Sequence, residues 1–177
     1  MEKITDNVFK INTGSNVYFL EKEKILIDTG IEDFSENLKK EIDCNSIKKV
    51  IFTHLHFDHI GNFKLFRNAK FYASKKEINF FKKSPLGAIL DRNLAKWFNV
   101  VLNDVNELKE FEVVETPGHT IGSICLLYKD VLFSGDTLFD CGCGRTDLPS
   151  SVESEMRNSL KKLDKIKYKF LCPGHDY

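Results

Sequence analysis

Residues 53–59, THLHFDH, constrain the fold of this chain more than any other stretch. Three imidazoles and one carboxylate fall within six positions here, and all four are side chains that bind divalent metals. The apolar run before them predicts a buried strand. Side chains alternate along an extended chain, so His54 and His56 point to one side, and a helical turn after them presents Asp58 and His59. We therefore expect two adjacent metal positions at the end of a strand.

The remaining histidines fall into similar settings. The chain has five histidines, and both of those outside residues 53–59, His119 and His175, directly follow a Pro-Gly pair. Pro-Gly is a turn signal, so both side chains are predicted to lie on loops. Imidazole together with carboxylate is the usual ligand set for zinc or non-haem iron. We expect these loops to join the cluster around residues 53–59.

The order of these motifs resembles the metallo-β-lactamase superfamily. His-x-His-x-Asp-His is followed by Gly-His-Thr, Gly-Asp-Thr and a final Gly-His, ending at residue 175. The resemblance implies one metal held by three histidines, a second metal held by another three side chains, and a carboxylate between the two. In that order, these residues are His54, His56 and His119, then Asp58, His59 and His175, then Asp136. It also implies catalytic roles for Asp58 and Asp136.

Hydrophobic periodicity predicts a mixed α/β (α+β) chain. The expected strands are residues 4–11, 17–20, 24–30, 50–53, 70–73, 110–115, 123–128, 130–134 and 169–172. The expected helices are one along Phe34, Leu38 and Ile42, one from a capping box at 74–77, one over 84–97, and one from a capping box at 150–153. This alternation favours two packed sheets covered by helices. The resemblance implies a four-layer αββα sandwich, and we expect residues 1–177 to form a single domain.

The third of these helices has two interpretations. Leu86, Ile89, Leu90, Leu94 and Trp97 form one apolar stripe, which ordinarily packs into a core. Alternatively this aromatic-rich segment, with Phe80, Phe81 and Phe98, walls a substrate pocket or meets a partner subunit. The second interpretation leaves a homo-oligomer open.

Composition excludes several classes of partner. Lys plus Arg and Asp plus Glu number 26 each, so no basic field favours nucleic acid. No run of about 20 apolar residues predicts a membrane span. Five scattered cysteines and a polar amino terminus suit a cytoplasmic protein with reduced thiols. Two of them, Cys141 and Cys143, are redox-active, soft ligands or, as is more common, buried and inert.

Four further residues are expected beside the ligands. The resemblance implies that Asp28 orients the metal loop through hydrogen bonds; by itself it also suits a plain turn. Thr53, Arg145 and Asp147 are likewise expected to contact the metal ligands without binding the metal themselves. Arg145 either pairs with a carboxylate such as Asp147 or meets an anionic substrate, and planar carboxylate partners favour the ion pair.

The chemistry expected of this centre is hydrolysis of a small-molecule substrate. Two metal ions lower the pKa of a bridging water towards roughly 7 and polarise the scissile bond. Zinc is the expected metal, with iron or manganese as alternatives. The runs at residues 135–139 and 142–149 resemble the glyoxalase II-like branch, which cleaves acyl-glutathione thioesters. That branch carries an added helical domain that binds glutathione, whereas the sequence here ends two residues after His175. A small thioester or other ester is therefore expected.

Two other functions fit the same motifs. The run Cys-Gly-Arg-Thr-Asp also resembles the persulfide dioxygenases, whose single iron would be held by His54 or His56, His119 and Asp136. A fold retained for binding, with a structural metal, is the third interpretation. The complete set of seven ligands favours the hydrolase over both.

Overall fold

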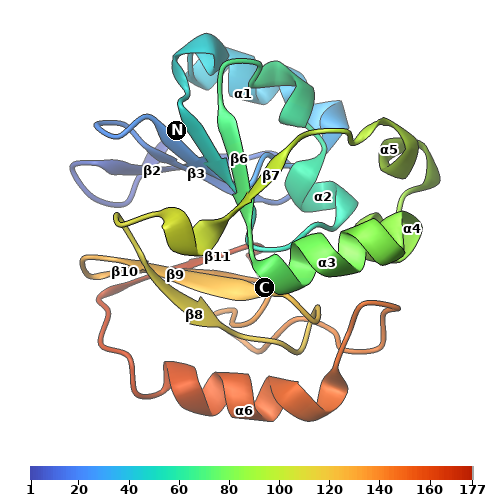
Figure 1. Ribbon diagram of the computed structural model, residues 1–177. Helices are drawn as coiled ribbons and strands as arrows, with labels where there is room; N and C mark the ends of the chain where they lie inside the picture. The colour runs from blue at the N-terminus through green and yellow to red at the C-terminus, as the bar shows by residue number, and fades with distance from the viewer. Residues whose placement is uncertain (177) are drawn as a thin grey trace.

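The computed structural model describes residues 1–176, which form two β-sheets (Figure 1). The larger sheet contains, in spatial order, β1 (Glu2–Lys3), β2 (Val8–Asn12), β3 (Asn16–Leu20), β4 (Ile25–Ile27), β5 (Lys49–Ile51), β6 (Lys70–Ala73) and β7 (Leu102–Asp104). The smaller sheet contains β11 (Phe170–Pro173), β10 (Val131–Gly135), β9 (Ile124–Tyr128) and β8 (Glu112–Glu115). Parallel pairing runs from β4 to β7 and between β10 and β11, so several metal-ligand loops leave strands at one edge.

Helices cover the outer face of each sheet (Figure 1). They are α1 (Ser35–Glu41), α2 (Phe57–Ile60), α3 (Lys75–Lys83), α4 (Pro85–Ile89), α5 (Arg92–Trp97) and α6 (Glu153–Leu163). Short 3-10 helices lie at Glu32–Phe34, Cys44–Ser46, Phe63–Leu65 and Val105–Glu107. Helices α1–α5 lie on the side of the larger sheet, and α6 lies beneath the smaller one. The αββα sandwich expected from the resemblance is confirmed.

The alternation of strand side chains explains the layers. Val50 packs among the helices on the outer face of the larger sheet, whereas the next residue, Ile51, points into the space between the sheets. There it joins a core that includes Phe133 of β10. On the outer face of the smaller sheet, Leu132 packs against Leu163 of α6. Three apolar layers therefore separate four layers of secondary structure.

Several predicted boundaries were wrong. The strand expected at residues 4–11 begins only at Val8, as β2, whereas β1 at Glu2–Lys3 and β7 were not predicted. The helix expected over 84–97 is broken into α4 and α5 at Leu90, whose φ of 64° is left-handed. That conformation is unfavourable for a branched side chain, and it turns the chain sharply between the two helices.

The break also divides the apolar stripe into a part that fits the first interpretation and a part that leaves the second open. Ile89, Leu94 and Phe98 are buried in the core, as core packing requires. Leu86 and Trp97 are instead exposed, Trp97 to 65%. The stripe is therefore core along one part only, and its exposed part remains available for a substrate or a partner.

The two predicted capping boxes have different outcomes. Ser74 caps α3 as expected, because its hydroxyl accepts a hydrogen bond from the Glu77 amide. The box at 150–153 was wrong: α6 begins at Glu153 after Val152, with no side-chain cap. The Ser150 hydroxyl is used elsewhere, as described below. Within residues 1–176, every helix is too short or too polar to cross a bilayer.

Candidate metal centre

Strand ends place all seven predicted ligands at one edge of the sandwich. His54 and His56 lie in the loop after β5, and α2 begins immediately afterwards, so Asp58 and His59 occupy its first turn. The other three residues follow or precede strands of the smaller sheet; they are His119 between β8 and β9, Asp136 after β10, and His175 after β11. The sequence prediction that remote loops converge agrees with this placement.

Three imidazoles form the first cluster. The ligand-type nitrogens of His54, His56 and His119 all lie within 4.8 Å of one another. His56 Nδ1 and His119 Nε2 are 2.9 Å apart, and all three side chains are buried. His54 Nε2 is buried and has no hydrogen-bond partner. Nitrogen lone pairs that converge in this way fit a metal such as zinc.

The second cluster combines a carboxylate with two imidazoles. Donor atoms of Asp58, His59 and His175 also lie within 4.8 Å of one another. Asp58 Oδ2 is 3.2 Å from His175 Nε2 and 3.9 Å from His59 Nε2. Asp58 and His175 are partly exposed, whereas His59 is fully buried. This cluster is therefore open to the surface on one side.

Asp136 lies between the clusters. Its Oδ2 is 3.4 Å from His119 Nε2 and 3.5 Å from His175 Nε2, so one oxygen faces a member of each cluster. Its Oδ1 is 3.3 Å from His59 Nε2, but the pair does not have hydrogen-bond geometry. Buried polar atoms without hydrogen bonds are rare and call for an explanation, and a bound cation would provide one.

In four of the histidine rings, the nitrogen that faces away from the centre contacts a neighbouring residue. Asp28 Oδ2 is 2.8 Å from His59 Nδ1, and the backbone oxygen of Arg145 is 2.8 Å from His119 Nδ1. The two hydroxyl partners lie 3.1 Å from their rings; they are Thr53 Oγ1 at His54 Nδ1 and Ser150 Oγ at His56 Nε2. Such contacts fix ring orientation and leave the inner nitrogen free to bind a metal.

Asp28 is the most connected of these neighbours. It is 2% exposed, and besides His59 it accepts hydrogen bonds from the Thr53 amide and the Thr53 hydroxyl, each at 2.8 Å. Its φ of 60° is left-handed, a conformation that Asp and Asn tolerate better than most residues. Asp28 is therefore more than a turn residue, and it joins the loop after β4 to the ligand loop after β5.

Arg145 and Asp147 have a different arrangement. Their side chains form a two-point ion pair at 2.7 and 2.8 Å, and both are exposed. The ion pair favoured by the sequence is therefore present. The side chains of neither residue contact a ligand in the described structure; only the Arg145 backbone does, through His119. Gly144 explains that approach, because a Cβ there would lie 2.9 Å from His119 Nδ1.

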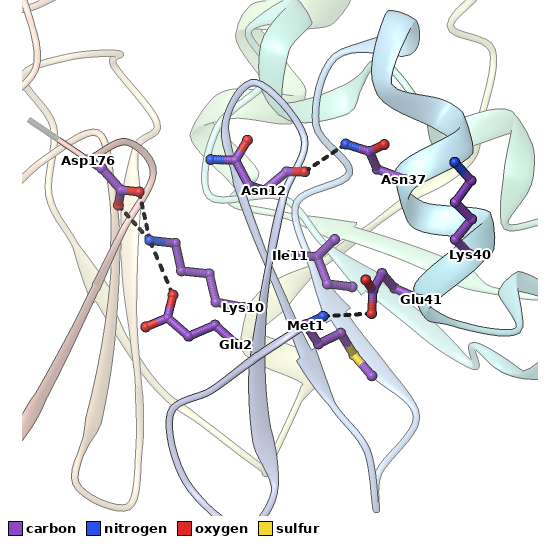
Figure 2. Close-up of a pocket in the computed structure, with 9 residues that line it drawn as sticks. All are labelled: Met1, Glu2, Lys10, Ile11, Asn12, Asn37, Lys40, Glu41 and Asp176. Carbon is purple, nitrogen blue, oxygen red and sulfur yellow. Dashed lines mark hydrogen bonds and ion pairs between the residues drawn. The ribbon is translucent and has the colours of Figure 1, made fainter.

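The loop that carries His175 is anchored from the larger sheet. Asn16 donates from its backbone amide to the Gly174 carbonyl at 2.7 Å, and Tyr18 donates to the Pro173 carbonyl at 2.8 Å. Lys10 on β2 reaches Asp176, the residue after His175, at 2.6 Å (Figure 2). These contacts connect the last strand of one sheet to the first strands of the other across the edge of the sandwich.

Charge in the buried centre favours a cation. Burial lowers the pKa of His56 to about 3 and lowers that of His54 strongly, so both rings are neutral. Burial also opposes a charge on His59, but Asp136, Asp28 and Asp58 outweigh it and raise the His59 pKa well above its ordinary value. Neutral imidazoles are the form that binds metals, and the surrounding carboxylates supply the negative charge. The donor set fits two divalent metal ions.

A cavity of about 490 Å³ opens over the centre. His56, Asp58, His119, Asp136 and His175 lie in its wall. The apolar part of the wall consists of Phe57, Leu90, Phe139 and Leu148. Cys141 and Cys143 also line it and are exposed, so the expectation that they are buried was wrong.

Sequence patterns did not indicate several residues that support the centre. Ser150 was assigned to a helix cap, yet it contacts His56; its neighbour Ser151 donates to the His119 carbonyl at 2.7 Å. Glu77 was also assigned to a cap, and its carboxylate contacts other segments instead. Leu90, at which α4 ends, lines the cavity. Local motifs report a residue's nearest neighbours in sequence, and these contacts are between distant segments.

Comparison with known proteins agrees with this geometry. The sequence profile described as the metallo-beta-lactamase superfamily matches residues 12–175. The probable metallo-hydrolase MJ0888 of Methanocaldococcus jannaschii is 36% identical over 182 residues, covering 92% of this chain and 87% of that protein. The probable polyketide biosynthesis zinc-dependent hydrolase PksB of Bacillus subtilis is 31% identical over 137 residues, covering 74% and 57%.

Solved structures show the same fold. The di-iron-bound form of TTHA1623 superposes with a TM-score of 0.75 at 25% identity, covering 96% of this chain and 92% of that one. The BLEG-1 B3 metallo-β-lactamase superposes with a TM-score of 0.68 at 22% identity, covering 96% and 92%, which speaks for the fold alone. By its sequence profile, its relatives and its αββα architecture, this chain belongs to the metallo-β-lactamase superfamily.

Proposed function

We propose that this protein is a metal-dependent hydrolase of a small ester or thioester whose leaving group carries no charge. His54, His56 and His119 would hold one metal ion, and Asp58, His59 and His175 the other, with Asp136 between them. The observation that carries the proposal is the second cluster: three further donor side chains lie within 4.8 Å of one another beside the three histidines. Metal ions at such a centre supply Lewis acidity and make water acidic near neutral pH.

The protein's own groups have separate tasks in this reaction. Burial opposes a charge on Asp58 and Asp136, but in the metal-free protein His59 lowers the pKa of both carboxyls, so each is ionised at neutral pH and available to a metal ion. Ionised carboxylates that face the cavity accept hydrogen bonds from water and orient it towards a substrate. Asp28, Thr53 and Ser150 keep the ligand rings in place while the substrate binds and leaves.

The wall of the cavity supports the substrate class. Among the described residues that line it, Arg145 is the only lysine or arginine, and Asp147 already occupies its guanidinium. Phe57 and Leu90 offer apolar surface instead. A substrate with several carboxylates, such as a glutathione conjugate, would leave its charges unpaired here. The resemblance to the glyoxalase II-like branch therefore supports the type of bond cleaved, and the wall supports a small substrate whose leaving thiol or alcohol carries no charge.

The test is hydrolysis by protein loaded with zinc, iron or manganese in turn. Acetyl, butyryl and hexanoyl thioesters of a neutral thiol are compared with S-lactoylglutathione. We expect cleavage of the neutral thioesters, loss of activity on chelation, and recovery when metal is returned. His175→Ala should lower the rate while His54, His56 and His119 remain. Full activity after complete metal removal would overturn the proposal.

Oxygen consumption with a persulfide substrate tests the dioxygenase alternative. That chemistry requires a single iron and would leave the Asp58, His59 and His175 cluster without a task, so we favour hydrolysis. TTHA1623 was solved in a di-iron-bound form, which is why iron is included among the metals to be loaded. Metal binding without turnover on either substrate class would support the non-catalytic alternative.

A further inference from the structure

Glu77 is a buried carboxylate that the proposed reaction does not use. It lies in the first turn of α3 and is 0% exposed. Burial raises the pKa of its carboxyl to about 7. A glutamate at this position of a helix ordinarily lies at the surface and returns to the cap residue. Isolated burial of a carboxyl is unfavourable, so its placement requires compensating contacts.

The compensating contacts come from two distant segments. Glu77 Oε1 accepts a hydrogen bond from the backbone amide of Leu55 at 3.1 Å. Its Oε2 accepts one from the Thr120 hydroxyl at 2.9 Å. Leu55 lies between His54 and His56, and Thr120 directly follows His119. One carboxylate therefore joins the two chain segments that supply the three-histidine cluster.

Further contacts hold α3 against the same loop. The Ser74 hydroxyl, which caps the helix, donates to the Gly122 carbonyl at 2.6 Å. A Cβ on Gly122 would lie 2.3 Å from the Glu77 amide nitrogen and 2.5 Å from Glu77 Oε2. Only glycine allows this approach without displacement of Glu77. The start of α3 thus contacts the loop between His119 and β9 closely enough to set its position.

We infer that Glu77 is a positioning residue for the metal held by His54, His56 and His119. Its carboxylate holds Leu55 and Thr120 at a set separation, and the flanking histidines then converge. This inference rests on the proposed function in one respect, that the three-histidine cluster binds metal. It predicts an effect on that cluster and a smaller effect on the one formed by Asp58, His59 and His175. The reason is that the hydrogen bonds of Glu77 go to Leu55 and Thr120, which are the direct neighbours of His54, His56 and His119 in the sequence.

Single-cluster backgrounds make the effect measurable. His175→Ala leaves the three-histidine cluster, and His119→Ala leaves the other one. Glu77→Ala is introduced into each background, and zinc affinity is measured by competition with a chromophoric chelator. We expect a loss of about tenfold or more in the His175→Ala background, because removing a group that supports metal ligands has effects of this size. We expect a change of less than about twofold, within ordinary scatter, in the His119→Ala background.

Two controls separate positioning from general destabilisation. Glu77→Gln should restore most of the affinity, because its amide can accept from Leu55 and donate to the Thr120 oxygen. Glu115→Ala removes an exposed carboxylate that pairs with Lys76 on the same helix, and it should leave both affinities unchanged. Cobalt substitution gives a second readout, since the absorption bands of Co²⁺ change when its ligand geometry changes.

The outcomes distinguish the two proposals. If the wild-type protein binds no metal, the proposed function fails and this inference fails with it. If the wild-type protein binds metal and Glu77→Ala leaves the three-histidine affinity unchanged, only the inference is overturned. Equal losses in both backgrounds would also overturn it, because they would show a general effect on folding.

Discussion

Asp28→Asn is predicted to weaken metal binding at the Asp58, His59 and His175 cluster. Asn tolerates the left-handed backbone at this position, so the loop should keep its conformation. The new amide oxygen can still accept from the Thr53 amide, and the new NH2 group can donate to the Thr53 hydroxyl. The contact that it cannot reproduce is the one with His59.

The structure shows why that single contact matters. His59 donates from Nδ1 to Asp28 Oδ2 at 2.8 Å, which keeps its Nε2 available beside Asp58 and Asp136. An NH2 group in place of Oδ2 favours the opposite tautomer, in which Nε2 carries the proton and cannot bind a metal. Loss of such a partner lowers metal affinity about 10–100-fold. This corresponds to about 1.4–2.7 kcal/mol of binding free energy.

Chelator competition on the His119→Ala background measures this affinity directly. Asp130→Asn is the matched control, because Asp130 lies in a surface turn and pairs with Lys169 at 3.2 Å. In metal-free protein, NMR titration should also show a lower His59 pKa in the Asn variant, since Asp28 contributes to raising it. An affinity within twofold of the parent, with an unchanged His59 titration, would refute the reasoning.

Three further predictions follow from the same contacts. Gly174→Ala should reduce metal content and destabilise the fold by about 1–3 kcal/mol, as overpacking does. The reason is that the new Cβ would lie 2.2 Å from Asp136 Oδ1. Two tightly bound metal ions in this variant would contradict the prediction. Wild-type protein should lose about 3 kcal/mol of stability relative to Glu77→Gln as the pH rises from 4.5 to above 7. Burial raises the Glu77 pKa to about 7 in the folded protein, and each tenfold difference in proton affinity between the folded and unfolded states is worth about 1.36 kcal/mol. Denaturant unfolding of both proteins measures this loss, and stability curves that stay parallel across this pH range would show that the carboxyl does not titrate there. Zinc at 1,000 times its dissociation constant should stabilise the protein by about 4 kcal/mol. Calorimetry would register this as a higher melting temperature that chelation reverses, and an equal increase in a His119→Ala, His175→Ala double variant, in which each cluster lacks a ligand, would exclude the assigned ligands.

The sequence by itself determined the class of protein and the residues that gather at the centre. Side-chain alternation and turn signals located most strands, and histidines placed just beyond strand ends must meet when those strands share an edge. The assignment of His54, His119, Asp136 and His175 to one centre, and the αββα fold, came from the resemblance of their motif order to the metallo-β-lactamase superfamily. Local spacing by itself indicated only that a cluster was likely.

Only the tertiary structure decided what holds those ligands in place. Ser150 and Glu77 both fit helix caps by spacing, yet one contacts His56 and the other joins Leu55 to Thr120. The separation of the apolar stripe into core and exposed surface likewise depended on the left-handed turn at Leu90. A spacing pattern describes neighbours along the chain, whereas hydrogen-bond partners and burial depend on which distant segments pack together.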